Sequence, residues 1–218
     1  MTIDLQMLGG IAALIEAALY VTGFGLFLTV LDSSGYEGHV QQISFLAANQ
    51  VASFIAYLLI YVVFGLVLVV LALALHARLK NGSPAIMQTA TAFGLIWAGL
   101  VIASGMIVNI GNSTVVGLFS ENQDQAVSLW LAIITVQEAL GGGNEIVGGL
   151  WVLLLSWAAL RENSLPKVLN YLGVLVGLAG ILTVVPAFDV LMDVFGLGQI
   201  VWFAWLGIVM LRESPIAT

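Results

Sequence analysis

Carboxylates inside apolar stretches are the residues of this sequence most able to do chemistry. Glu138 and Glu145 flank a run of three glycines within QEALGGGNEIVGGLW, residues 137–151, and Glu16 lies in the first apolar stretch. An ionised carboxylate surrounded by lipid is costly unless water or a partner solvates it. We therefore expect Glu16 and Glu145 to face the protein interior or to be protonated.

Two roles fit such carboxyl groups. One is a site that binds a proton or a cation, and the other is a neutral carboxyl group that hydrogen-bonds a neighbouring helix and holds the bundle together. Glu138 and Glu145 share one helix face if the helix is continuous, although Glu138 lies close enough to the membrane surface to be hydrated. Glu16 is expected at a different depth from Glu145, so we do not expect the two to pair.

Amide side chains occur at the depth of Glu145 in neighbouring apolar stretches. Together with Glu145 they could line a polar cavity that faces the outer side of the membrane. Alternatively, they cap helix ends and meet water at the membrane interface. The residues concerned are Asn49, Gln50, Asn109, Asn112 and Asn144.

The composition indicates that lipid is the solvent around these groups. The chain has 218 residues, of which 61% are hydrophobic and 8% are charged, whereas about 25% of a soluble domain is charged. So few charges cannot cover the surface of a water-soluble globule. The chain contains no cysteine, which excludes disulfides and thiolate chemistry, and its five basic residues form no patch that would bind nucleic acid.

Six apolar stretches approach the length of about 20 residues that spans a bilayer. The sequence therefore predicts an all-α integral membrane bundle, folded as a single domain of six transmembrane helices. The first is expected to be retained as a helix, because no basic residue precedes it as in a signal peptide. The expected spans are residues 7–31, 45–76, 85–110, 126–160, 168–187 and 194–211.

The fourth span is too long for one straight crossing. Its roughly 35 residues would extend about 52 Å as a helix, against a hydrocarbon core of about 30 Å. We expect a kink or a break at Gly141–Gly143, since glycine weakens a helix; a tilted helix that protrudes from the membrane is the alternative. Other glycines, including the GxxxG pair Gly173 and Gly177, are expected to let helices pack closely.

The basic residues predict the orientation of the chain. All five follow the second, fourth and sixth spans, whereas the loops after the first, third and fifth spans carry acidic residues. By the positive-inside rule both termini lie in the cytoplasm. We expect a multi-pass protein of the bacterial plasma (inner) membrane. The basic residues are Arg78, Lys80, Arg161, Lys167 and Arg212.

The last three spans resemble a known family. The segments NEIVGGLWVLLLSWAALR, LPKVLNYLGVLVGLAGI and GQIVWFAWLGIVMLR are similar to an uncharacterised bacterial family of polytopic membrane proteins, filed as a domain of unknown function, and the ANQ of residues 48–50 is compatible with it. Where this chain has GGGNE, many members carry a charged residue at the start of the fourth helix. The resemblance implies a multi-helix membrane fold and assigns no catalytic residue.

No catalytic or metal-binding pattern accompanies these features. His39 and His76 are expected on opposite sides of the membrane, and the chain has no HExxH motif. We therefore predict no metal site and a non-enzymatic protein, with any cofactor left open. An intramembrane enzyme is the weakest of the alternatives considered.

The predicted function is that of an accessory or structural subunit, or of a binder of a lipophilic or small ligand in an outward-facing intramembrane pocket. The aromatic row Phe54, Tyr57, Tyr61 and Phe64 could floor such a pocket or could simply fill the core. The alternative function is a small proton- or cation-coupled transporter that uses Glu145, Glu138 and Glu16. Expected partners are membrane lipids and further subunits or a second copy of the chain, not nucleic acid.

Reporter fusions test the predicted orientation. Reporters placed after Leu31 and after Asp124 should be active only in the outer compartment, and one placed after Lys80 only in the cytoplasm, because basic residues are retained inside. Alkaline phosphatase and green fluorescent protein activities measure the two locations. A reversal at any one of the three sites would contradict the topology.

Overall fold

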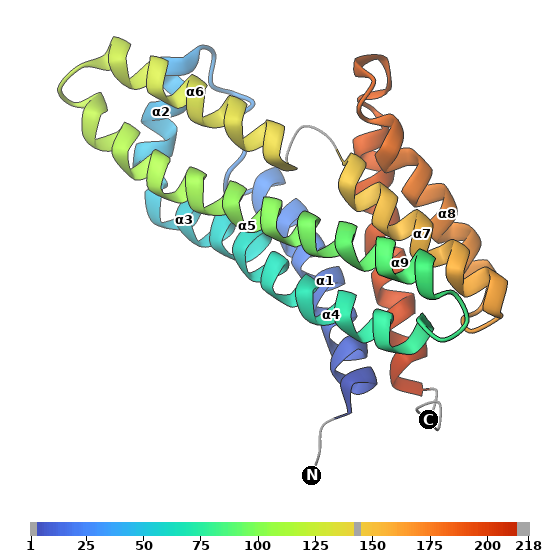
Figure 1. Cartoon of the computed structure of the whole chain (residues 1–218). Coiled ribbons are helices and arrows are strands. Elements are labelled where there is room, and N and C mark those ends of the chain that lie inside the picture. The colour runs from blue at the N-terminus through green and yellow to red at the C-terminus, as the bar shows by residue number, and fades with distance from the viewer. Residues whose placement is uncertain (1–3, 142–144, 213–218) are drawn as a thin grey trace.

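The computed structural model describes residues 4–141 and 145–212, and throughout these ranges the regular structure is helical (Figure 1). The long second helical region is divided into α3, the π-helix η1 and α4. The elements in chain order are α1 (Leu5–Leu28), α2 (His39–Ala48), α3 (Gln50–Tyr57), η1 (Leu58–Val63), α4 (Phe64–Leu79), α5 (Pro84–Phe119), α6 (Gln123–Gly141), α7 (Ile146–Glu162), α8 (Lys167–Leu182), the short 3-10 helix η2 (Pro186–Phe188) and α9 (Leu191–Arg212).

The helices have the length and composition of membrane spans. Among the described residues, five segments are long and apolar enough to cross a bilayer, namely Leu5–Leu28, Gln50–Leu79, Pro84–Phe119, Gln123–Glu162 (counted across the glycine run) and Leu191–Arg212. The helix α8 is apolar but has 16 residues, fewer than the roughly 20 that a straight crossing needs. The all-α membrane class is thus confirmed, and the sixth span stays a prediction.

The surface of the bundle is apolar. Many large aliphatic side chains are exposed, and some of them over most of their area, such as Leu28 (71%), Val51 (73%) and Ile110 (70%). In water such a surface would be strongly unfavourable, whereas lipid chains solvate it without cost. The exposed side chains therefore support a lipid environment for these helices.

Aromatic rings from α1, α4, α5, α7 and α9 meet at the centre of the bundle. Neighbouring ring centroids lie between 5.3 and 6.4 Å apart, many in edge-to-face contact. Such pairs contribute about 0.5–1.5 kcal/mol each beyond simple burial. We call this set the aromatic core; it consists of Tyr20, Phe64, Trp97, Trp151, Phe195, Trp202 and Phe203.

Glycines on facing helices make room for these rings. A Cβ atom on Gly94 would lie 2.6 Å from the Trp151 indole nitrogen, and one on Gly148 would lie 2.7 Å from the Trp97 ring. The helices α7 and α8 approach through their backbones, where a Cβ on Gly177 would lie 2.8 Å from the Gly149 carbonyl oxygen. The close packing expected of these glycines is therefore present.

The helix α5 is much longer than the sequence indicates. It continues past Ile110 to Phe119 and has 36 residues, a length of about 54 Å. The polar residues after Ile110 suggested a loop, but α2 and α6 pack on this part of α5 through a small cluster of Ile43, Val115 and Ala126. We call α2, α3, α6 and the last third of α5 the extension (Figure 1).

Two further boundaries differ from expectation. Residues 39–42, expected as loop, begin α2, and the second span starts at Gln50 after the non-helical Asn49 (φ −117°, ψ 25°). In the fourth region α6 ends at Gly141 and α7 begins at Ile146, with Glu145 in a non-helical conformation (φ −114°, ψ 22°). These ends lie where the glycine run predicts an interruption; positions 142–144 are outside the described residues.

The α7–α8 contact predicts the effect of one methyl group. Gly177→Ala should lower the free energy of unfolding by about 1–3 kcal/mol, because its Cβ would meet backbone atoms that cannot move aside. Gly99→Ala is the matched control, since a Cβ at Gly99 meets nothing within 4 Å. Thermal unfolding in detergent measures both. Equal stability of the two variants would contradict the packing described here.

Candidate functional site

A cavity of about 330 Å³ lies against the aromatic core, between α1, η1, α4, α5, α9 and the start of α7. Seven of its sixteen lining residues are aromatic, and Tyr20, Phe64, Trp97 and Phe195 belong both to the cavity and to the aromatic core. We call it the aromatic cavity. The lining residues are Leu19, Tyr20, Gly23, Phe24, Phe27, Ile60, Tyr61, Phe64, Trp97, Val101, Gly141, Glu145, Met192, Asp193, Phe195 and Gly196.

Glu145 is fixed in the wall of this cavity by its own backbone. Its N–H donates a hydrogen bond to Thr183 Oγ1 (2.8 Å), and its carbonyl oxygen accepts one from the Gly149 N–H (2.8 Å). The Thr183 hydroxyl in turn donates to the Gly180 carbonyl oxygen (2.7 Å). Glu145 is thus held at the start of α7 by the end of α8, and it is half-buried.

A second carboxylate lines the same cavity. Asp193, in the first turn of α9, is exposed, and it comes from a different part of the chain than Glu145. From the sequence, Asp193 is one of several acidic residues expected in the outer loops. It lies two residues before the buried Phe195 at the start of an apolar helix, and this position could have indicated that it lines a cavity.

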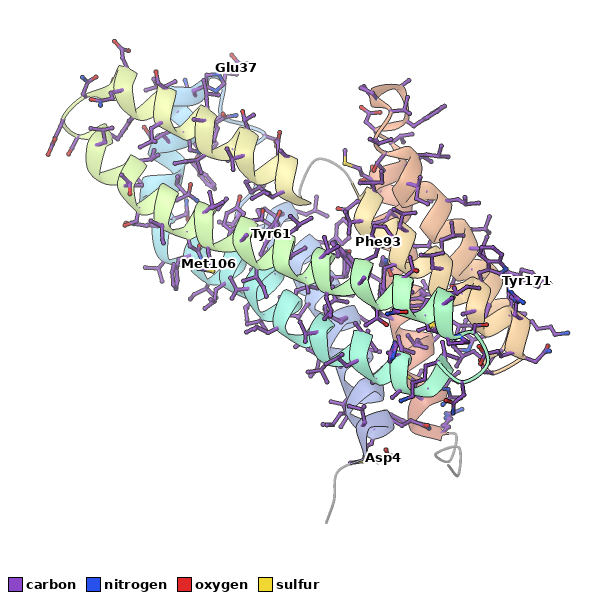
Figure 2. All side chains as sticks on the ribbon, viewed as in Figure 1. Asp4, Glu37, Tyr61, Phe93, Met106 and Tyr171 are labelled. Atoms are coloured by element: carbon purple, nitrogen blue, oxygen red, sulfur yellow. The ribbon has the colours of Figure 1, made fainter. Side chains whose placement is uncertain are left out.

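The π-helix η1 brings Tyr61 to the cavity, at the middle of the bundle (Figure 2). The Gln137 side-chain amide donates a hydrogen bond to the Tyr61 hydroxyl (2.9 Å), and the Gln137 carbonyl oxygen accepts one from the Ser104 hydroxyl (3.2 Å). Gly105 lies beneath Tyr61, where a Cβ would be 2.5 Å from the tyrosine Cβ. This network joins α5 and α6 to the cavity wall.

Those predicted amides that the structure describes do not line the cavity that Glu145 lines. Gln50, Asn109 and Asn112 border a larger space of about 530 Å³ between α3 and α5, while Asn49 and Asn112 border a smaller one of about 140 Å³. The larger space is a surface groove, since its lining residues Val51 and Ile110 are largely exposed. The Asn49 amide caps its own helix by donating to the Phe45 carbonyl oxygen (3.0 Å), which favours the capping role for this residue.

The remaining predicted residues lie elsewhere. Glu138 is exposed on α6, and Asn144 is outside the described residues. Glu16 is completely buried in α1, and neither of its carboxylate oxygens has a hydrogen-bond partner in the part of the chain that the structure describes. Gln199 in α9, the helix that packs along α1, is also completely buried, and its side-chain amide has no hydrogen-bond partner among the described residues.

The aromatic residues of the second span line three different spaces. Tyr61 and Phe64 line the aromatic cavity, Tyr57 lines the small space beside Asn49, and Phe54 is half exposed in the surface groove. Part of the row therefore lines a pocket, as one of the two interpretations of the row proposed. The π-helix lies between Tyr57 and Phe64, and its wider turn rotates the side chains after it relative to those before it, so that these two rings point to different spaces.

The histidines have local partners. His76 Nδ1 lies 2.8 Å from Thr91 Oγ1, and the His39 ring packs against that of Trp130, with centroids 5.7 Å apart. Within residues 4–141 and 145–212, no three metal-ligating side chains come together. The two histidines lie in different elements, α2 and α4.

Apolar helices of spanning length and a lipid-type surface define a multi-pass membrane protein. The family model described as "Domain of unknown function (DUF4386)" matches residues 7–209. The chain belongs to this family, which confirms the resemblance seen in the last three spans. No curated protein and no solved structure matches the chain.

Proposed function

We propose that this protein binds a small lipophilic molecule in the aromatic cavity. The observation that supports the proposal is the cavity itself, which combines aromatic walls with a few polar groups from separate helices. Ligand sites are commonly concave and mostly apolar, with a small number of polar groups that orient the ligand. The volume of about 330 Å³ suits a molecule with one or two rings.

The predicted orientation indicates on which side of the membrane the aromatic cavity lies. The cavity is lined by the second half of α1 and by the starts of α7 and α9. In a six-span topology with cytoplasmic termini, these ends face outward. The proposed pocket therefore opens toward the outer half of the bilayer, where it can exchange a ligand with lipid or with the outer solution.

The lining offers few groups for catalysis. Its described residues include no serine, cysteine, lysine or histidine, and Glu145 and Asp193 are the carboxyl groups that a general base would require. A non-enzymatic binder of this kind also suits an accessory subunit in the plasma membrane. The exposed apolar stripe of α8, which includes Val168, Tyr171 and Leu175, is a face for lipid, for another subunit or for a second copy.

A cavity-filling substitution tests the proposal. With para-trifluoromethyl-tert-butylbenzene as a neutral probe, fluorine NMR of the protein in nanodiscs should show a saturable bound signal. Met192→Trp should abolish this signal, because the indole occupies the cavity, whereas Val190→Trp should preserve it, since Val190 is exposed and outside the lining. The absence of a saturable signal in the unsubstituted protein would contradict the proposal.

A proton- or cation-coupled transporter using Glu145, Glu138 and Glu16 is the second candidate. The buried Glu16 carboxyl group supports it, since carboxyl groups inside membrane segments often belong to proton relays. In liposomes, Glu16→Gln should then abolish proton movement driven by the ligand gradient while ligand binding persists. Glu121→Gln, at an exposed loop position, is the matched control. Unchanged coupling in Glu16→Gln would contradict this role.

A further inference from the structure

The ionisable groups of the aromatic cavity are either neutral or negatively charged. Glu145 and Asp193 are acidic, and the described lining contains no lysine, arginine or histidine. Tyr20 and Tyr61 line the same space as Glu145 and add hydroxyl oxygens to its walls. A low-dielectric space with this arrangement repels anions and attracts cations.

The walls are suited to a particular kind of cation. The faces of tyrosine and tryptophan rings attract cations that lie against them, and the attraction reaches about 2 kcal/mol where water is excluded. Tyr20, Tyr61 and Trp97 come from three different elements and border one space. This arrangement is typical of pockets for ammonium groups, whose charge is spread over carbon substituents.

A metal ion fits the same lining poorly. Calcium takes about six to eight oxygen ligands and magnesium prefers six. The described lining offers side-chain oxygens only from Glu145, Asp193, Tyr20 and Tyr61, and the rest of it is hydrocarbon. The combination of few oxygens with many rings therefore favours an organic cation.

We propose that the ligand of the aromatic cavity is a hydrophobic organic cation, an amine or quaternary ammonium carrying one or two rings; this inference rests on the proposed function. Glu145 is the main counter-ion, because it is half-buried and its backbone is fixed by Thr183. Asp193 is exposed, and it attracts the cation at the mouth of the cavity through a field that salt screens.

Two probes of equal shape and different charge test the inference. Fluorine NMR titrations compare para-trifluoromethylphenyltrimethylammonium with para-trifluoromethyl-tert-butylbenzene, in which carbon replaces the charged nitrogen. The cation should bind about tenfold more tightly or better, as a cation–π contact and a counter-ion together provide. Binding is taken from the saturable signal that Met192→Trp removes, so partition into lipid is subtracted.

The variants identify the counter-ion. Glu145→Gln should remove most of the preference for the cation, because it lowers the affinity for the cation far more than the affinity for the neutral probe; the amide keeps the shape of the side chain and loses its charge. Asp193→Asn should lower the affinity for the cation less, and mainly at low salt. Glu121→Gln is the control, since it removes one negative charge at an exposed position outside the lining residues.

The outcomes separate this inference from the proposed function. Equal affinity for the two probes would overturn the cation assignment and leave a lipophilic pocket in place. A preference for the cation that survives both Glu145→Gln and Asp193→Asn would overturn the assignment of these carboxylates. If neither probe gives a saturable signal, the proposed function fails together with the inference.

Discussion

The packing of aromatic rings into glycine hollows is the interaction on which this bundle depends. Lipid is as apolar as the side chains, so burial of apolar surface does not drive helices together within a membrane. Close van der Waals contact must supply the attraction. The Trp151 and Trp97 rings make this contact by packing directly against Gly94 and Gly148. The Phe195 ring packs against Gly180 in the same way, where an added Cβ would lie 2.6 Å from the ring. A side chain at any of these glycines would separate the helices.

The aromatic cavity follows from the same packing. Beyond the rings of the aromatic core, Gly23, Gly141 and Gly196 line the adjoining space and contribute no side chain to fill it. The π-helix and the start of α7 then bring Tyr61 and Glu145 to this space from separate parts of the chain. The residues that seal the centre of the bundle therefore also form the floor of its pocket.

The sequence predicted the membrane class and the position where the fourth region changes helix, because hydropathy and glycine content report these directly. The family was predicted from the similarity of the last three spans. The sequence failed to predict which residues share a cavity. Depth in the membrane can be estimated by counting residues from a charged end, but the face that a residue presents depends on helix rotation. The π-helix shifts that rotation between Tyr57 and Phe64, so these two rings line different spaces. Asn109 and Glu145, on other helices, also line different spaces. Asp193 was missed because its cavity is formed only when α9 meets α1.

The extension differs from the rest of the molecule in how firmly it is held. Its described cluster has no buried side chain larger than Ile43, whereas the main bundle buries several tryptophans and phenylalanines. Regions with little buried apolar surface open locally at a lower free energy than the core does. The helix α6 belongs to the extension, yet its Gly141 borders the aromatic cavity. If a molecule binds in the aromatic cavity as proposed, its release should therefore depend on local opening of α6 more than on the core beneath the cavity.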